Sequence, residues 1–182
     1  MATDRTTATL VDALRRGQRE AQEQFLRQYA PILFANIVRL VDNAADAEEL
    51  TQDALMQALR HIDNFDPARS RLQTWLTRIA NNLAVSHLRK KKPENCLPLD
   101  ERRPLPDDTL PPFEAESPSL LEQAMSTLPP DDQSLMWLFY ADDLPLAEIA
   151  YITGRSPSNV ATRLHRLRHR LRDTIINLKN RQ

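Results

Sequence analysis

Apolar residues recur every three or four positions along most of the chain, and this spacing predicts amphipathic helices. At the start of the chain we expect a pair of helices, followed by another helix that begins near Pro31, because proline suits a first helical turn. The apolar faces of these helices should hold Leu10, Leu14, Ala21, Phe25, Leu26, Ile32, Leu33, Ile37, Val38 and Leu40. The chain should therefore open as a small helical bundle.

Two longer helices are expected to complete this half. The first should begin with the Asp-x-x-Glu sequence at Asp46, which resembles a capping box. It should end near Asn64, because Pro67 disfavours helix in the residue before it. After a short loop, the second should run from Leu72 into a basic end and stop at Pro93.

Proline marks the boundary between the two halves, since nine of the 13 prolines lie between Pro93 and Pro130. The stretch from Pro93 to Pro118 has no apolar periodicity, which is typical of an extended linker. Beyond it we expect four helices, over 120–128, 131–141, 146–152 and 157–178. The prediction is an all-α chain of two small domains, 1–93 and 120–182, joined by an acidic, proline-rich linker over 94–119.

Composition agrees with helices and indicates a cytoplasmic protein. Only 2 glycines are present, too few for the tight turns of a strand-rich fold. The single cysteine, Cys96, excludes an internal disulfide and a multi-cysteine zinc site, which fits a reducing compartment. The polar N-terminus does not resemble a signal peptide, and no uncharged apolar run approaches the roughly 20 residues that a bilayer requires. We therefore expect no membrane insertion.

The distribution of charge along the chain is more informative than the net charge. The total of -1 argues weakly against a nucleic-acid partner. However, residues 1–93 hold 14 basic and 11 acidic side chains, and residues 94–120 hold 2 basic and 7 acidic ones. The segment 154–182 holds 8 basic residues and one acidic residue. Segregation of this kind predicts two basic surfaces separated by an acidic tether.

The strongest local motif lies in the basic C-terminal segment. A short helix should end at Gly154, which can take the left-handed conformation of a sharp turn. Ser156 and Pro157 suit the cap and the first turn of the next helix. One buried stripe of that helix is predicted at Val160, Leu164, Leu167 and Leu171. Off the stripe, and expected to face solvent, lie Arg163, Arg166 and Arg170. A helix-turn-helix with such an arginine row can read the major groove of DNA, the alternative being a solvated basic helix that caps a bundle.

Two other helical faces carry polar side chains. On the helix from Leu72, a hydrogen-bonding stripe is formed by Arg78, Asn82, Ser86 and Arg89. Such side chains serve phosphates and unpaired bases. On the helix before it, the face opposite the apolar stripe carries Glu49, Gln52, Asp53, Met56, Gln57 and Arg60. This second face could bind a partner helix, although either face, taken alone, is more simply a solvated surface.

Groupings of side chains typical of catalysis are missing from the sequence. His165 and His169 have the spacing of a shared metal site, but they lie among arginines. The sequence has no glycine-rich phosphate loop, and no base is positioned beside Cys96. We predict neither an enzyme nor a bound metal or cofactor.

In combination, these motifs resemble the extracytoplasmic-function (ECF) group of bacterial RNA polymerase sigma factors. The matching segments, in chain order, are Asp46-Ala-Glu-Glu-Leu-Thr-Gln-Asp53, Phe65-Asp-Pro67, Trp75-Leu-Thr-Arg-Ile-Ala-Asn-Asn-Leu83 and the helix-turn-helix. The resemblance covers roughly residues 10–93 and 120–178. Each motif alone is moderately specific, and together in this order they are highly specific.

The resemblance implies a role for each part. Docking on core RNA polymerase would use Asp46, Glu49, Gln52, Asp53 and Gln57. Capture of the melted minus-ten strand, with one flipped base, would use Phe65, Asp66, Arg69, Ser70, Arg71, Arg78, Asn82, Ser86 and Arg89. Reading of the minus-thirty-five duplex would use Ser158, Asn159, Thr162, Arg163, Arg166 and Arg170. The implied partners are core RNA polymerase and promoter DNA, with an anti-sigma factor as a further candidate.

The chain departs from the family in two places, and two other classes compete with this interpretation. Ala161 stands where the family often has a basic residue, and Arg69 and Arg71 leave the base preference of the loop open. A helix-turn-helix repressor or activator would have a ligand-binding or dimerising N-terminal domain, which has no need of the N-terminal motifs. An enzyme is more distant, because the catalytic groupings are missing.

Overall fold

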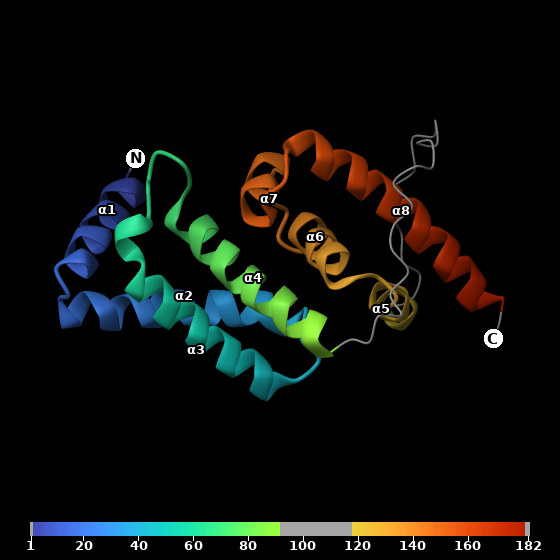
Figure 1. Cartoon of the computed structure of the whole chain (residues 1–182), viewed down its shortest axis with the longest axis horizontal. Coiled ribbons are helices and arrows are strands. Elements are labelled where there is room, and N and C mark those ends of the chain that lie inside the picture. The colour runs from blue at the N-terminus through green and yellow to red at the C-terminus, as the bar shows by residue number, and fades with distance from the viewer. Residues whose placement is uncertain (1, 92–117, 181–182) are drawn as a thin grey trace. The chain divides into compact units, whose positions relative to one another are not determined.

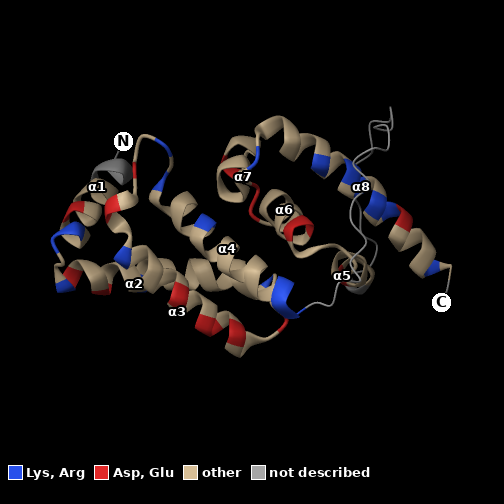
Figure 2. Ribbon diagram, viewed as in Figure 1, with Lys and Arg blue, Asp and Glu red and all other residues tan. Residues whose placement is uncertain are grey.

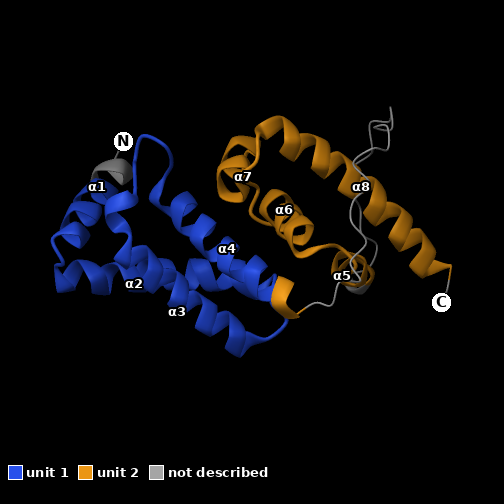
Figure 3. Ribbon diagram, in the orientation of Figure 1, with its two compact units in different colours: residues 1–88 blue, residues 89–182 orange. Residues whose placement is uncertain are grey.

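The computed structural model describes residues 2–91 and 118–180, and there it consists of helices joined by short turns (Figure 1). The chain divides into two compact units, residues 1–88 and 89–182 (Figure 3). The all-helical prediction is therefore confirmed. The predicted linker lies outside the described residues except for its last two positions, and Cys96 lies outside them as well. In the part of the chain that is described, no helix is long and apolar enough to cross a membrane.

The first unit is a bundle whose elements are α1 (Ala2–Arg15), α2 (Arg19–Val38), α3 (Ala44–Arg60), the short 3-10 helix η1 (Ile62–Asn64) and α4 (Leu72–Lys91). Gly17, with a φ of +69°, makes the tight turn between α1 and α2. The largest fully buried side chains of this unit are Phe25, Leu33, Ile37, Leu72 and Leu76. Burial of these apolar faces drives the helices together. The predicted core is largely confirmed, but Leu26 and Val38 are exposed.

The predicted break at Pro31 is wrong, because α2 continues through this proline. Phe25, Tyr29, Leu33 and Ile37 follow one another at intervals of four, and all are buried. Pro31 itself is exposed, so its ring lies on the solvent side of the helix. The apolar stripe on the other side evidently outweighs the one backbone hydrogen bond that proline removes.

The N-terminus of α3 is capped by Asn43, three residues before Asp46, where the helix was predicted to begin. The Asn43 side-chain oxygen accepts hydrogen bonds from the backbone N–H groups of Ala45, at 2.9 Å, and Asp46, at 3.4 Å. These bonds satisfy two of the donors that a helix start leaves open. The helix ends at Arg60, and η1 carries the chain on to Asn64, close to the predicted end.

Replacing Asn43 with alanine should lower the free energy of unfolding by about 1 kcal/mol, because the two donors then lose their acceptor. Urea denaturation followed by circular dichroism measures the change. The variant Asn43→Asp keeps an acceptor at the cap and should remain close to the parent. An alanine variant as stable as the parent would show that the cap does not contribute to folding.

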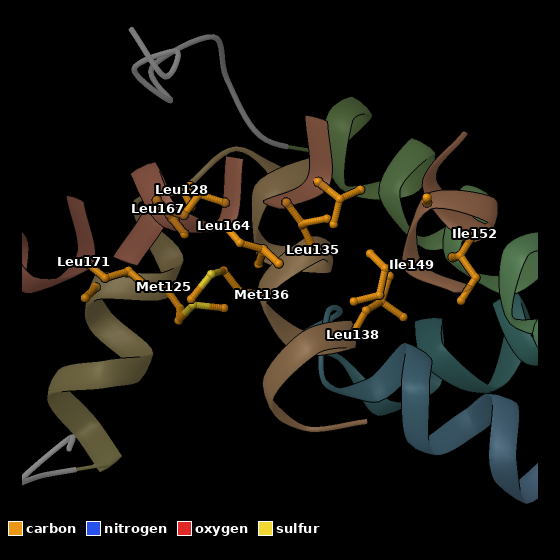
Figure 4. Close-up of a cluster of buried hydrophobic side chains, with 13 residues drawn as sticks. Met125, Leu128, Leu135, Met136, Leu138, Ile149, Ile152, Leu164, Leu167 and Leu171 are labelled. Carbon is orange, nitrogen blue, oxygen red and sulfur yellow. The ribbon is translucent and has the colours of Figure 1, made fainter. Parts of the chain in front are cut away.

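The second unit contains α5 (Pro118–Ser126), α6 (Pro130–Tyr140), α7 (Leu146–Thr153) and α8 (Pro157–Lys179). These bounds lie within about two residues of the predicted ones. Its core gathers leucine, isoleucine and methionine side chains from all four helices (Figure 4). Each member of the predicted stripe on α8 is buried: Val160, Leu164, Leu167 and Leu171. Burial of this stripe fixes which face of α8 remains available to a ligand.

Candidate nucleic-acid interface

The turn between α7 and α8 has the geometry that the sequence predicts for a helix-turn-helix. Gly154 ends α7 with a φ of +69°, in the left-handed region that glycine adopts without steric conflict. Ser156 caps α8, because its hydroxyl oxygen accepts the backbone N–H of Asn159 at 3.2 Å. The Arg155 guanidinium also donates to the side-chain oxygen of Asn159, at 3.4 Å. These two bonds hold the turn against the first turn of α8.

Basic residues follow α8 along its length (Figure 2). At its start, Ser158 and Asn159 are exposed, whereas Thr162, Arg166 and Arg170 are half-buried. The aliphatic stem of an arginine can lie along a helix surface and bury part of the side chain. The helix thus carries polar residues beside its buried stripe, although Arg166 and Arg170 are less exposed to solvent than predicted.

Arg163 is the exception, because its predicted orientation toward solvent is wrong. Its side chain is only 15% exposed and forms a bidentate ion pair with Asp132 of α6. Arg163 Nε lies 2.5 Å from one carboxylate oxygen, and Nη2 lies 3.2 Å from the other. Asp132 is fully buried, and a buried carboxylate needs a charged partner. Arg163 therefore ties α8 to α6 rather than extending toward a ligand.

In the first unit, the loop between η1 and α4 forms a defined turn. The Asp66 side chain accepts the backbone N–H of Ala68 at 2.9 Å, and the Asp66 carbonyl accepts the N–H of Arg69 at 3.1 Å. Aspartate followed by proline is the sequence that favours such a turn, since Pro67 fixes one of its dihedral angles. The loop is thus ordered before any ligand arrives, and it presents exposed Arg69 and Arg71.

Phe65, which was predicted to contact DNA, belongs to the core. Its side chain is 4% exposed, and its ring centroid lies 5.6 Å from that of Trp75. Offset or tilted aromatic pairs at this separation are mutually attractive. Phe65 therefore anchors one end of the loop, and it is also one of the residues that line a cavity beside the loop.

A cavity of about 930 Å³ opens beside this loop, with walls from α1, α2 and the loop itself. Among its lining residues are Arg15, Gln28, Tyr29, Ile32, Ser70 and Arg71. The Ser70 hydroxyl oxygen is buried, and no group of the described residues bonds it. Burial raises the pKa of the Tyr29 hydroxyl, so this group remains protonated at neutral pH. The cavity thus has a mixed polar and apolar lining, which includes Ser70, whose hydroxyl bonds to no described residue.

The predicted polar stripe on α4 lies on its outward face. Asn82, Ser86 and Arg89 are exposed, and Arg78 is half-buried. On the opposite side, Ala80, Ala84 and Leu88 are buried. Since the stripe follows the loop directly along the chain, one ligand strand can contact both.

The predicted face of α3 is exposed at most of its positions. Glu49, Gln52, Asp53 and Gln57 are exposed, and Met56 between them is 48% exposed. Asp46 differs, because its carboxylate lies 3.4 Å from Nε2 of His87 on α4 and is 22% exposed. Acidic residues gather on the first half of α3 (Figure 2).

Sequence reasoning missed two charged residues that the fold brings into these sites, Arg15 and Asp132. Arg15 at the end of α1 donates a hydrogen bond of 2.8 Å to the Phe65 carbonyl. Asp132 lies in the first turn of α6, a position where an acidic residue is favoured by the helix dipole. Neither contact has a local sequence signal, because the partners lie 50 and 31 residues apart.

The described residues contain no cluster of three or more histidine, cysteine or acidic side chains that could hold a metal ion. The His165 and His169 rings lie 4.8 Å apart on α8 without a third ligand group of this kind. What the two units offer instead is a polar helix after a sharp turn and a loop beside a cavity. Both features suit recognition rather than catalysis.

Comparison with known protein families decides between the classes of DNA-binding protein. The sigma-70 region 2 family matches residues 25–94, and the sigma-70 region 4 family matches residues 119–171. The chain belongs to the ECF sigma factors. It is therefore a promoter-recognition subunit of RNA polymerase that acts in transcription initiation and is not itself an enzyme.

Relatives of this ECF sigma factor extend along nearly the whole chain. It is 29% identical to the ECF RNA polymerase sigma factor SigW of Bacillus subtilis, over 92% of this chain and 96% of that protein. It is 28% identical to the RNA polymerase sigma factor CarQ of Myxococcus xanthus, over 91% of this chain and 95% of that protein.

Solved structures show the same fold. The sigma factor RpoE of Bartonella quintana, solved in complex with the anti-sigma factor NepR, matches with a TM-score of 0.59 and 25% identity, covering 84% of this chain and 94% of that one. CnrH, solved in complex with the cytosolic domain of CnrY, has a TM-score of 0.64 at 17% identity, covering 92% of this chain and 95% of that one. The second likeness concerns the fold alone.

Proposed function

We propose that this ECF sigma factor selects promoters at two places, with α8 on the minus-thirty-five duplex and with the 66–71 loop and α4 on the melted minus-ten strand. The observation that carries the proposal is the cavity beside the loop, which is lined in part by Ser70, a residue whose buried hydroxyl bonds to no described residue. In this view residues 1–93 bind the polymerase and the minus-ten strand, residues 120–182 read the duplex, and residues 94–119 form an acidic, proline-rich tether.

Capture of a single strand requires a base outside the stack, and unstacking costs a few kcal/mol. A protein site must offset this cost with contacts that the duplex does not offer. The cavity has room for a base, and Ser70 can supply a hydrogen bond that it makes to no described residue of the protein. Exposed Arg69 and Arg71 would bind the adjoining phosphates, and Asn82 and Ser86 on α4 would bind neighbouring nucleotides.

Reading of the duplex would begin at the first turn of α8. Its exposed Ser158 and Asn159 would contact phosphates or bases, since the N-terminus of a helix favours negative charge. Thr162, Arg166 and Arg170 follow on the same helix and would contact the groove. We exclude Arg163 from this set because Asp132 occupies two of its donors.

Replacing Arg166 with alanine should weaken binding to the minus-thirty-five sequence more than to a scrambled duplex. A bidentate arginine–guanine pair is worth about 1–3 kcal/mol of discrimination. The holoenzyme and two labelled duplexes suffice for the measurement. Arg172→Ala removes the same charge from an exposed position further along α8 and should reduce both affinities alike. Equal loss on both duplexes for Arg166→Ala would limit that residue to a phosphate contact.

Docking on the polymerase would use the exposed face of α3, with Glu49, Gln52, Asp53 and Gln57 as its polar contacts. Met56 adds an apolar side chain at its centre. Asp46 would take part from the edge of this face, next to its contact with His87. A protein that works as a polymerase subunit acts in the cytoplasm. Because RpoE of Bartonella quintana binds an anti-sigma factor, we propose such an inhibitor as a further partner here.

Co-purification tests the docking proposal directly. The tagged full-length chain should retain core RNA polymerase through a moderate-salt wash. Charge reversal at Glu49 and Asp53 together should abolish retention while the circular dichroism spectrum stays unchanged, since both side chains are exposed. Retention that survives this change would place the docking surface elsewhere on the chain.

A further inference from the structure

Arg15 lies at the C-terminal end of α1 and contacts the chain 50 residues further on. Its Nη2 donates a hydrogen bond of 2.8 Å to the carbonyl oxygen of Phe65, the residue directly before the 66–71 loop. Oxygens of Asp12 and Asp63 each lie 3.9 Å from the same guanidinium group. Since the side chain is 35% exposed, the bond is partly shielded from water and stronger than a fully solvated one.

The residue that Arg15 holds is the anchor of the loop. The Phe65 ring lies against Trp75, and its backbone N–H donates to the Ile62 carbonyl at 3.1 Å. With the Arg15 bond, the ring, the N–H and the carbonyl of Phe65 are all engaged. The turn that begins at Asp66 therefore starts from a fixed point, and that point sets where Ser70 lies.

The same helix also forms a wall of the cavity. The cavity is lined by Thr7, Ala8, Val11, Asp12 and Arg15 of α1, together with residues of the loop. The loop and α1 lie side by side in Figure 1. A cavity that grips a flat base needs walls at a set separation, and the Arg15–Phe65 bond is a direct link between these two.

We propose that α1 is part of the minus-ten site and that Arg15 is its positioning residue: it holds the Phe65 carbonyl, and so sets the separation between α1 and the loop that receives the base. The proposal rests on the proposed function of the loop. Arg15 acts through Phe65, so it governs how well a base fits rather than contributing its charge to the affinity for DNA in general.

The matched pair Arg15→Ala and Arg16→Ala tests this. Both variants remove one positive charge from the end of α1, and Arg16 is exposed. Each full-length variant, bound to core RNA polymerase, is titrated with a single-stranded minus-ten oligonucleotide and with a scrambled one. Arg15→Ala should reduce the ratio of the two affinities by about tenfold, the size expected for one lost charge-assisted hydrogen bond. Arg16→Ala should leave the ratio unchanged.

A second measurement separates positioning from general stability. In the free chain, hydrogen exchange at the Ala68, Arg69 and Ser70 amides reports the bonds that these groups donate to Asp66. Arg15→Ala should speed exchange at these amides and leave those of α3 and the middle of α4 protected, and Arg15→Lys should restore part of the protection.

Two results would overturn the proposal. An equal loss of selectivity in Arg15→Ala and Arg16→Ala would mean that Arg15 acts only by charge attraction. Faster hydrogen exchange throughout the unit in Arg15→Ala would mean that Arg15 stabilises the whole unit. Selectivity missing from the parent chain would instead overturn the proposed function of the loop. The exchange experiment uses no DNA, so it judges the hold of Arg15 on the loop independently of that function.

Discussion

Replacing Arg163 with alanine is expected to lower the free energy of unfolding of the second unit by about 3–5 kcal/mol, because removing one partner of a buried ion pair leaves the other charge uncompensated. The charge left behind is that of Asp132, which is fully buried. Urea denaturation, combined with hydrogen exchange at the amides of α6 and α8, measures the loss in this unit.

The control is Arg172→Ala, which removes the same side chain from an exposed position on the same helix. Its effect should stay within about 0.5 kcal/mol, as is usual for surface substitutions. Replacing Arg163 and Asp132 together with leucine should recover much of the lost stability, since a well-packed apolar pair can substitute for a buried ion pair. Equal stability of the Arg163 and Arg172 variants would show that the Arg163–Asp132 ion pair does not stabilise the unit. Arg163 would then return to the set of DNA-contacting residues.

The second large effect concerns the loop. Exchanging residues 66–71 for a glycine-serine segment of equal length should reduce the preference for the minus-ten strand over a scrambled strand by about a hundredfold, the equivalent of the few kcal/mol that base capture must supply. The exchange removes the Asp66 turn, the Ser70 hydroxyl and both exposed arginines. Docking on core polymerase should persist, because the face of α3 is unchanged. Titration of the holoenzyme with labelled oligonucleotides measures the strand preference, and co-purification with core polymerase measures the docking.

Asn82→Ala should reduce the same preference by a smaller factor, since it deletes one exposed amide of α4. Asn177→Ala, which deletes an exposed amide of α8, is the matched control and should change nothing on single strands. A loop exchange that leaves strand selectivity intact would show that the cavity does not receive the base, although membership of the ECF sigma factors would stand.

Much of the fold could be predicted from the sequence, because periodicity and helix-end signals are local. Gly154 and Ser156 mark the helix-turn-helix, and the structure has the predicted left-handed turn and side-chain cap there. Pro31 shows where a local signal fails. A proline disfavours helix, yet four buried residues around it keep α2 continuous, and burial is a property of the whole bundle.

The sites were harder to predict, because a residue's position on a helix does not reveal its neighbours from other helices. Arg163 lies off the apolar stripe of α8, as do the other arginines, but it is the one that faces Asp132 of α6. Phe65 precedes a polar loop and was assigned to DNA, yet the ring of Trp75 makes it part of the core. Arg15 has no sequence signal at all, since its partner is a backbone carbonyl far along the chain.

The central claim is that the chain directs RNA polymerase by reading promoter DNA at two separate places. Transcription from a template library with randomised upstream DNA, using core polymerase and the full-length chain, tests it most directly. Sequencing the templates that yield transcripts should reveal two enriched blocks, and core polymerase alone should enrich neither. In the loop-exchange variant the block nearer the start site should fade while the distant block remains. A single block, or none, would contradict the account.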